Sequence, residues 1–139
     1  MPGWTTLVQA ETLSVALARP DVVVLDCRFD LAENNAGENA WMQAHIPGAR
    51  YAHLDRDLSG PLQPAKGRHP WPEAADFGER LQRWGISPQT QVVAYDDESG
   101  AFAARAWFLL RALGHEKVAV LDGGWKRWTA LGLPVDSRV

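Results

Sequence analysis

Residues 91–105, with the sequence QVVAYDDESGAFAAR, decide how this chain folds. The apolar run Val92–Tyr95 is typical of a strand that is buried on both faces of a parallel sheet. The polar residues Asp96–Gly100 form a loop at the carboxyl end of this strand, and a helix follows from Ala101. Open α/β sheets bind ligands at this edge, where the N–H groups at the start of a helix can hold an anion. The stretch therefore predicts an anion-binding loop, although its first position is an aspartate and not a nucleophile.

The rest of the chain alternates apolar runs with segments of helical periodicity. Further strands are expected at Thr6–Val8, Val22–Leu25, Ala49–Ala52 and Val118–Leu121, and helices around residues 13–17, 40–44, 77–84, 101–110 and 125–128. Residues 53–72 contain four prolines and two glycines without periodicity, so we expect a long functional or mobile loop there. This alternation predicts one α/β domain with a mostly parallel five-stranded sheet and helices on both faces.

The composition excludes several classes of protein. The length of 139 residues fits one domain, and the net charge of −3 comes without the basic run that a nucleic-acid partner would need. The chain starts without a signal-peptide pattern and holds no run of roughly 18 apolar residues, so we expect a cytoplasmic protein without a membrane span. The single cysteine, Cys27, excludes an internal disulfide. No metal-ligand or nucleotide-binding motif is present, so no metal and no cofactor are expected.

Several segments, in this order, resemble the rhodanese-like family: LDCRFDL, HIPGARYAHLD, DLSGP, GRHPWP, VVAYDDESGAFAARAWFLLRALGH and VLDGGWKRW. From about Val8 to Pro134 the chain is similar to the amino-terminal half of tandem-domain sulfurtransferases that use thiosulfate or 3-mercaptopyruvate. The resemblance implies a rhodanese-like domain at residues 1–134, the start of an interdomain linker at 135–139, and a carboxyl-terminal catalytic rhodanese domain as partner. In that partner domain, a cysteine at the first position of the loop after the fourth strand carries the persulfide.

In this chain the matching loop carries an aspartate at the cysteine position. The equivalent residues are Asp96, Asp97, Glu98, Ser99, Gly100 and Ala101. A carboxylate cannot carry sulfane sulfur, and the acidic triplet would repel an anionic donor, so we predict that the loop is noncatalytic. The Asp96 carboxylate is instead expected to accept hydrogen bonds from the loop amides and to cap the loop. A phosphatase of the rhodanese-like type would need a cysteine at position 96 and an arginine at position 102, where this chain has Asp96 and Phe102.

Two further residues near the predicted sheet edge have a structural and a functional interpretation. Cys27 ends a buried strand, which favours an inert packed thiol over a sulfur carrier. Arg105 lies inside the helix after the loop and is expected to pair with a carboxylate such as Asp26 or Asp122.

Three residues are candidates for an interdomain active site because of the resemblance. His45 lies in the turn motif HIPGA, where it either bonds a nearby backbone group or, as the resemblance implies, supplies a proton relay to the partner domain. Phe29 and Phe102 either face the partner domain or plug their own loops. If a partner domain covers this edge, then the edge that bears Phe29, His45 and the loop at 53–72 should expose an apolar patch beyond the ~300–600 Å² usual for a monomer.

Two functions from different classes remain open at this point. The chain is either the noncatalytic amino-terminal domain of a sulfurtransferase or a free-standing, inactive rhodanese-like binding or regulatory module whose acidic loop recognises a partner.

Overall fold

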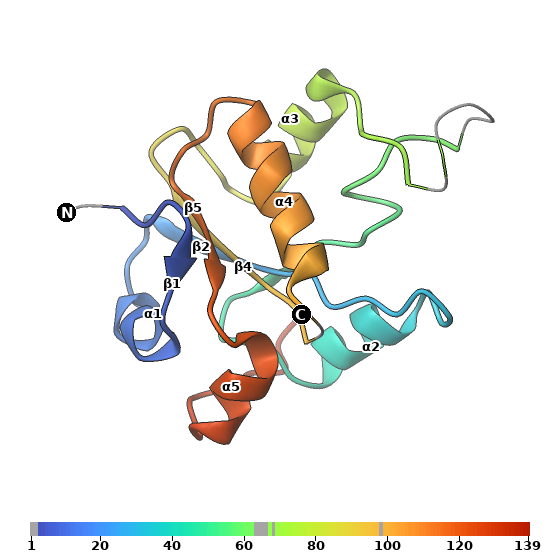
Figure 1. Ribbon diagram of the computed structural model, residues 1–139. Coiled ribbons are helices and arrows are strands. Elements are labelled where there is room, and N and C mark those ends of the chain that lie inside the picture. The colour runs from blue at the N-terminus through green and yellow to red at the C-terminus, as the bar shows by residue number, and fades with distance from the viewer. Residues whose placement is uncertain (1–2, 63–66, 68, 98) are drawn as a thin grey trace.

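The computed structural model describes residues 3–62, 67, 69–97 and 99–139, and within them five strands form one sheet (Figure 1). The strands are β1 (Leu7–Val8), β2 (Val22–Asp26), β3 (Arg50–Tyr51), β4 (Gln91–Tyr95) and β5 (Val118–Leu121). Their order across the sheet is β1-β5-β4-β2-β3, and every pairing is parallel. The predicted α/β class and the five-stranded sheet are therefore confirmed, with β4 at its centre.

Helices cover both faces of this sheet, as predicted (Figure 1). The helices are α1 (Ala10–Ala16), α2 (Ala36–Gln43), α3 (Ala74–Arg83), α4 (Ala101–Ala112) and α5 (Gly124–Ala130). One hydrophobic core packs α3 and α4 against the sheet, and a second packs α1 and α5 against the other face. Because side chains alternate along a strand, neighbouring β4 residues serve different cores: Val92 and Ala94 join the first, Val93 and Tyr95 the second. This two-sided burial explains why the β4 sequence is a continuous apolar run.

Most elements differ from the expectation by a few residues at their ends. The helix expected around residues 40–44 begins at Ala36, and its Gly37 lies so close to the Arg28 carbonyl that a Cβ would not fit there. The strand expected at Ala49–Ala52 is limited to Arg50 and Tyr51. The close approach of Gly37 to Arg28 is a contact that helical periodicity does not report.

The segment after α5 packs onto the domain. The backbone N–H of His45 donates to the Asp136 carbonyl, and the Asp136 N–H donates to the His45 carbonyl, both at 2.8 Å. The Trp128 indole also donates to the Pro134 carbonyl. Residues 135–139, expected to begin a linker, are therefore fixed against the domain as far as Asp136. None of the described helices is long and apolar enough to cross a membrane.

Candidate functional site

The loop after β4 is closed by its own first residue. The buried Asp96 carboxylate accepts hydrogen bonds from the N–H groups of Gly100 at 3.1 Å and Ala103 at 2.8 Å. Gly100 precedes α4 with a φ of 90°, a left-handed conformation that favours glycine. The predicted cap is therefore confirmed. Asp97 is half-buried and Ser99 is exposed, while Glu98 lies outside the described residues.

The Asp96 backbone is also fixed by the loop after β5. Its carbonyl accepts a hydrogen bond from the N–H of Trp125 at 3.0 Å. A Cβ on Gly124 would lie 2.4 Å from this carbonyl oxygen, so a side chain at that position would push the two loops apart. The amides of Gly100 and Ala103 thus already serve a carboxylate of the same chain.

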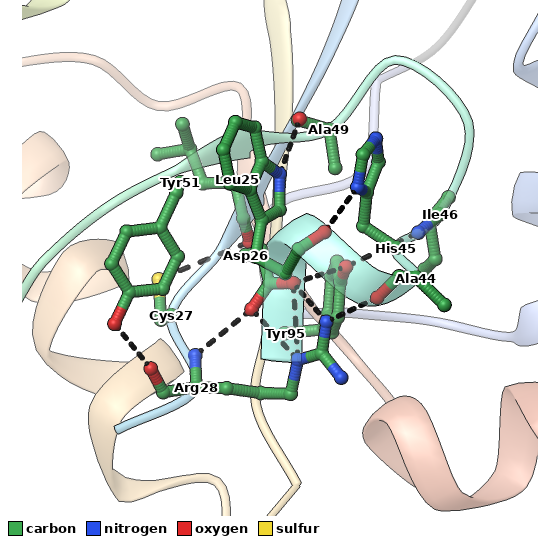
Figure 2. Close-up of polar contacts among 11 residues, drawn as sticks. Leu25, Asp26, Cys27, Arg28, Ala44, His45, Ile46, Ala49, Tyr51 and Tyr95 are labelled. Atoms are coloured by element: carbon green, nitrogen blue, oxygen red, sulfur yellow. Dashed lines mark hydrogen bonds and ion pairs between the residues drawn. The ribbon is translucent and has the colours of Figure 1, made fainter. Parts of the chain in front are cut away.

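A buried ion pair lies beside this loop, at the ends of β2 and β4 (Figure 2). The Arg28 guanidinium donates to both oxygens of Asp26, with the shortest contact at 2.7 Å, and to the Ala44 carbonyl. The Tyr95 hydroxyl donates to Asp26 and accepts from the N–H of Ile46. Burial raises the pKa of the Asp26 carboxyl, although the bonds from Arg28 and Tyr95 oppose the rise. Burial acts to lower the pKa of Arg28, but Asp26 outweighs it and the pKa is raised. This network buries the side chains of Asp26, Arg28 and Tyr95 at the ends of β2 and β4.

The surroundings of Cys27 make its thiol unreactive. Its side chain is buried in the first core, and its Sγ contacts the Leu25 carbonyl at 3.9 Å. Burial raises the pKa of Cys27 well above its ordinary value, and the charges of Asp26 and Asp96 raise it further. The thiol therefore stays protonated at neutral pH, which supports the inert alternative.

Phe29 is a local plug. Its side chain is 4% exposed, and its ring packs edge-on against Phe102 at 5.8 Å and against His53 at 5.1 Å. Phe102, half-buried at the start of α4, closes the contact from the other side. Of the two alternatives for Phe29, its burial supports the local plug, and its side chain adds no exposed surface to the expected patch.

His45 is buried as well, with 1% of its surface exposed. Its Nδ1 donates to the Trp41 carbonyl at 2.6 Å, and its ring stacks on the Trp41 ring with centroids 5.1 Å apart. Of the two alternatives for His45, the hydrogen bond to a nearby backbone group is the one observed, and the buried ring adds no exposed surface to the expected patch. Its neighbours Ala44 and Ile46 bond to Arg28 and Tyr95 of the buried network (Figure 2).

Arg105 does not pair with Asp26 or Asp122, so that expectation is wrong. Its guanidinium donates to the backbone carbonyls of Leu58, His69 and Pro70, all at 2.9–3.2 Å. Burial lowers its pKa, while the charge of Asp55 opposes the change. Arg105 therefore ties the long loop between β3 and α3 to helix α4.

The same long loop holds a histidine–carboxylate pair that sequence reasoning missed. His69 Nδ1 lies 2.9 Å from an Asp55 oxygen, and the two side chains are 27% and 41% exposed. In a neutral ring this bond places the proton on Nδ1 and makes Nε2 an acceptor. His53 fixes the turn that carries Asp55, because its Nδ1 accepts the backbone N–H of Asp55 and of Arg56. The sequence did contain a signal for this pair. The segments HIPGARYAHLD and GRHPWP place an aspartate and a histidine in one long polar loop.

This pair faces a hollow of about 480 Å³ on the surface. Leu31, Leu62, Asp55 and His69 are among the residues that line it. An imidazole held by a carboxylate at the wall of a hollow can transfer protons to a group that enters the hollow. Among the described residues no group of three or more His, Cys, Asp or Glu side chains could hold a metal ion.

The comparisons with known proteins agree with this fold. The profile of the rhodanese-like domain family matches residues 9–131, so the chain belongs to that family. It is 49% identical, over 129 residues, to a probable 3-mercaptopyruvate sulfurtransferase of Pseudomonas aeruginosa, covering 91% of this chain and 45% of the relative. It is 39% identical, over 137 residues, to the thiosulfate sulfurtransferase of Gallus gallus, covering 93% of this chain and 46% of the relative.

A solved structure shows the same similarity. The 3-mercaptopyruvate sulfurtransferase from Leishmania major superposes with a TM-score of 0.88 at 29% identity, over 97% of this chain and 37% of that one. The chain thus spans about half the length of the curated relatives, or less.

Proposed function

We propose that this domain is the amino-terminal, noncatalytic half of a two-domain sulfurtransferase that takes sulfur from thiosulfate or 3-mercaptopyruvate. The observation that carries the proposal is the occupancy of the loop after β4, where the amides hold the carboxylate of Asp96. Sulfur transfer through a persulfide requires a thiolate, and the thiol of Cys27 is buried with a raised pKa. A second domain must therefore supply the nucleophile.

The length of the relatives supports a second domain. The matched segment accounts for 45% of the Pseudomonas aeruginosa relative and 46% of the Gallus gallus relative, which leaves room in each for another domain of similar size. Both relatives are named as sulfurtransferases, and they differ in the donor that their names give. Because the names of the relatives give two different donors, both stay in the proposal.

The contribution of this domain to the reaction is the pair of His69 and Asp55, in place of His45. His45 is buried and its Nδ1 is bonded to a carbonyl, so it cannot reach a group outside the domain. His69 lies at the wall of a surface hollow, and Asp55 holds its ring in one tautomer. The pair would accept a proton from, or donate one to, the substrate bound at the catalytic cysteine of the second domain.

The first test is the natural gene beyond the codon for Val139, together with the mass of the natural protein. We expect a second rhodanese-like domain with a cysteine at the first position of the loop after its fourth strand. A natural protein that ends near Val139 would contradict the proposal and favour the free-standing binding module.

The second test concerns the relay in the whole protein. His69→Gln should lower kcat about 100-fold, as expected for loss of a general acid or base, with a smaller effect of Asp55→Asn. Arg56→Ala, on the same turn, is the matched control and should leave kcat unchanged, because the Arg56 side chain is 51% exposed and bonds to Glu38 on the surface. An unchanged kcat and an unchanged pH profile in His69→Gln would remove the pair from the mechanism.

A further inference from the structure

Two aromatic rings lie side by side on the surface, next to the hollow that His69 lines. Trp71 is 58% exposed and Phe108 is 51% exposed, and their ring centroids are 5.3 Å apart. We call these two residues the aromatic face. Trp71 belongs to the long loop before α3, and Phe108 belongs to α4, so two distant parts of the sequence build the face together.

The aromatic face is held in place by Arg105. The guanidinium carbon of Arg105 lies 4.4 Å from the centroid of the Trp71 ring, a cation–π contact. The same group donates hydrogen bonds to the carbonyls of His69 and Pro70, which come directly before Trp71. A partner that binds here therefore meets a ring whose position is already fixed, and it loses little conformational entropy on binding. Such rigid, exposed aromatic residues are typical of the residues that dominate protein interfaces.

The aromatic face is continuous with the His69 site. Trp71 follows His69 by two positions in the sequence. Arg105 donates a hydrogen bond to the His69 carbonyl and also lies over the Trp71 ring. Leu31 and Leu62, which are 60% and 77% exposed, line the hollow on the side of His69 and extend the apolar surface. A body that reaches His69 would therefore also cover these side chains.

We infer that the aromatic face of Trp71 and Phe108 is where the second domain of the same protein docks onto this one. The inference rests on the proposed function, and it replaces Phe29 and His45 with residues that are exposed. The occupant is a second domain because the curated relatives are about twice as long as the matched segment. Exposed apolar residues elsewhere, such as Val15 on α1 and Leu131 after α5, lie at a distance from His69 in the fold and serve as controls.

Hydroxyl-radical footprinting of the whole natural protein and of the 139-residue chain tests the inference. Oxidation of Trp71 and Phe108, read by mass spectrometry, should be strong in the 139-residue chain and mostly lost in the whole protein. Oxidation of Val15 and Leu131 should be the same in both. Equal oxidation of Trp71 in both proteins would overturn the docking surface, even where the gene encodes a second domain and the proposed function stands.

A pair of variants separates docking from folding. Because Trp71 is exposed, Trp71→Ser should leave the urea midpoint of the 139-residue chain nearly unchanged. In the whole protein, the same substitution should let the two domains separate more easily, as measured by small-angle scattering. Val15→Ser, the matched control, should change neither. Loss of Trp71 oxidation in the isolated chain with rising concentration would show that two copies associate through the aromatic face, and this would overturn the second domain as its occupant.

Discussion

The loops after β4 and after β3 lie at the same edge of the sheet, and their backbone groups find hydrogen-bond partners in different ways. In the loop after β4, Asp96 turns its carboxylate inward and satisfies the amides of Gly100 and Ala103. In the loop after β3, Arg105 from α4 satisfies the carbonyls, and the side chains of Asp55 and His69 stay near the surface. The loop after β4 is therefore closed by its own carboxylate, and the long loop after β3 carries an accessible histidine and aspartate.

The same contrast holds for charge. The pair of Asp26 and Arg28 is buried beside the closed loop, with side chains 0% and 4% exposed. The pair of Arg56 and Glu38 lies near the open loop, with side chains 51% and 31% exposed. Breaking the buried pair leaves a charge without a partner in a medium of low polarity, whereas water replaces the partner at the exposed pair.

The largest effect is therefore expected from Arg28→Ala. The substitution leaves the Asp26 carboxylate buried without its cation, and the free energy of unfolding should fall by about 3–5 kcal/mol. Arg56→Ala is the matched control and should cost less than about 1 kcal/mol. Urea unfolding followed by tryptophan fluorescence measures both. Equal losses in the two variants would contradict the contrast between the closed and the open loop.

An intermediate effect is expected from Asp96→Ala. The amides of Gly100 and Ala103 lose their acceptor, and the free energy of unfolding should fall by about 1–3 kcal/mol. Asp97→Ala, at the next position, should change it by less than about 0.5 kcal/mol, since the Asp97 side chain is only half-buried. A stability of Asp96→Ala equal to that of the unmodified chain would show that the carboxylate does not hold the loop.

The smallest effect on stability is expected from His69→Ala. The hydrogen bond with Asp55 is partly exposed, so its loss should cost less than about 1 kcal/mol in the isolated chain. The thermal midpoint of the variant, measured beside that of His45→Ala, sharpens the comparison, because the His45 ring is buried and its variant should be the less stable of the two. A larger loss in His69→Ala than in His45→Ala would assign His69 a structural role instead.

The sheet could be predicted from the sequence because its strands are short apolar runs that local patterns report. The strand at Val118–Leu121 agrees with the expectation residue by residue, and the central strand differs only by the addition of Gln91. The cap at Asp96 could also be predicted, since it depends on amides within seven residues along the chain. These features depend on residues that are close together in the sequence.

The features that sequence reasoning missed are long-range. Arg105 bonds to carbonyls 35 to 47 positions away, and no local pattern names those partners. His45 is a candidate because of the resemblance, and its burial depends on Trp41 and on the backbone of Asp136, which lie outside the motif. The motif located a turn correctly and gave no information on which histidine reaches the surface.

The most direct test of the central claim is thiocyanate production from thiosulfate and cyanide by the 139-residue chain, with Cys27→Ser and Asp96→Cys beside it. We predict background turnover for the unmodified chain and for Cys27→Ser, because Cys27 is buried and its thiol stays protonated. Asp96→Cys should restore little, because Asp97 and Glu98 would raise the pKa of the new thiol and repel the anionic donor. Robust turnover by the unmodified chain that disappears in Cys27→Ser would contradict the noncatalytic assignment and make Cys27 the sulfur carrier.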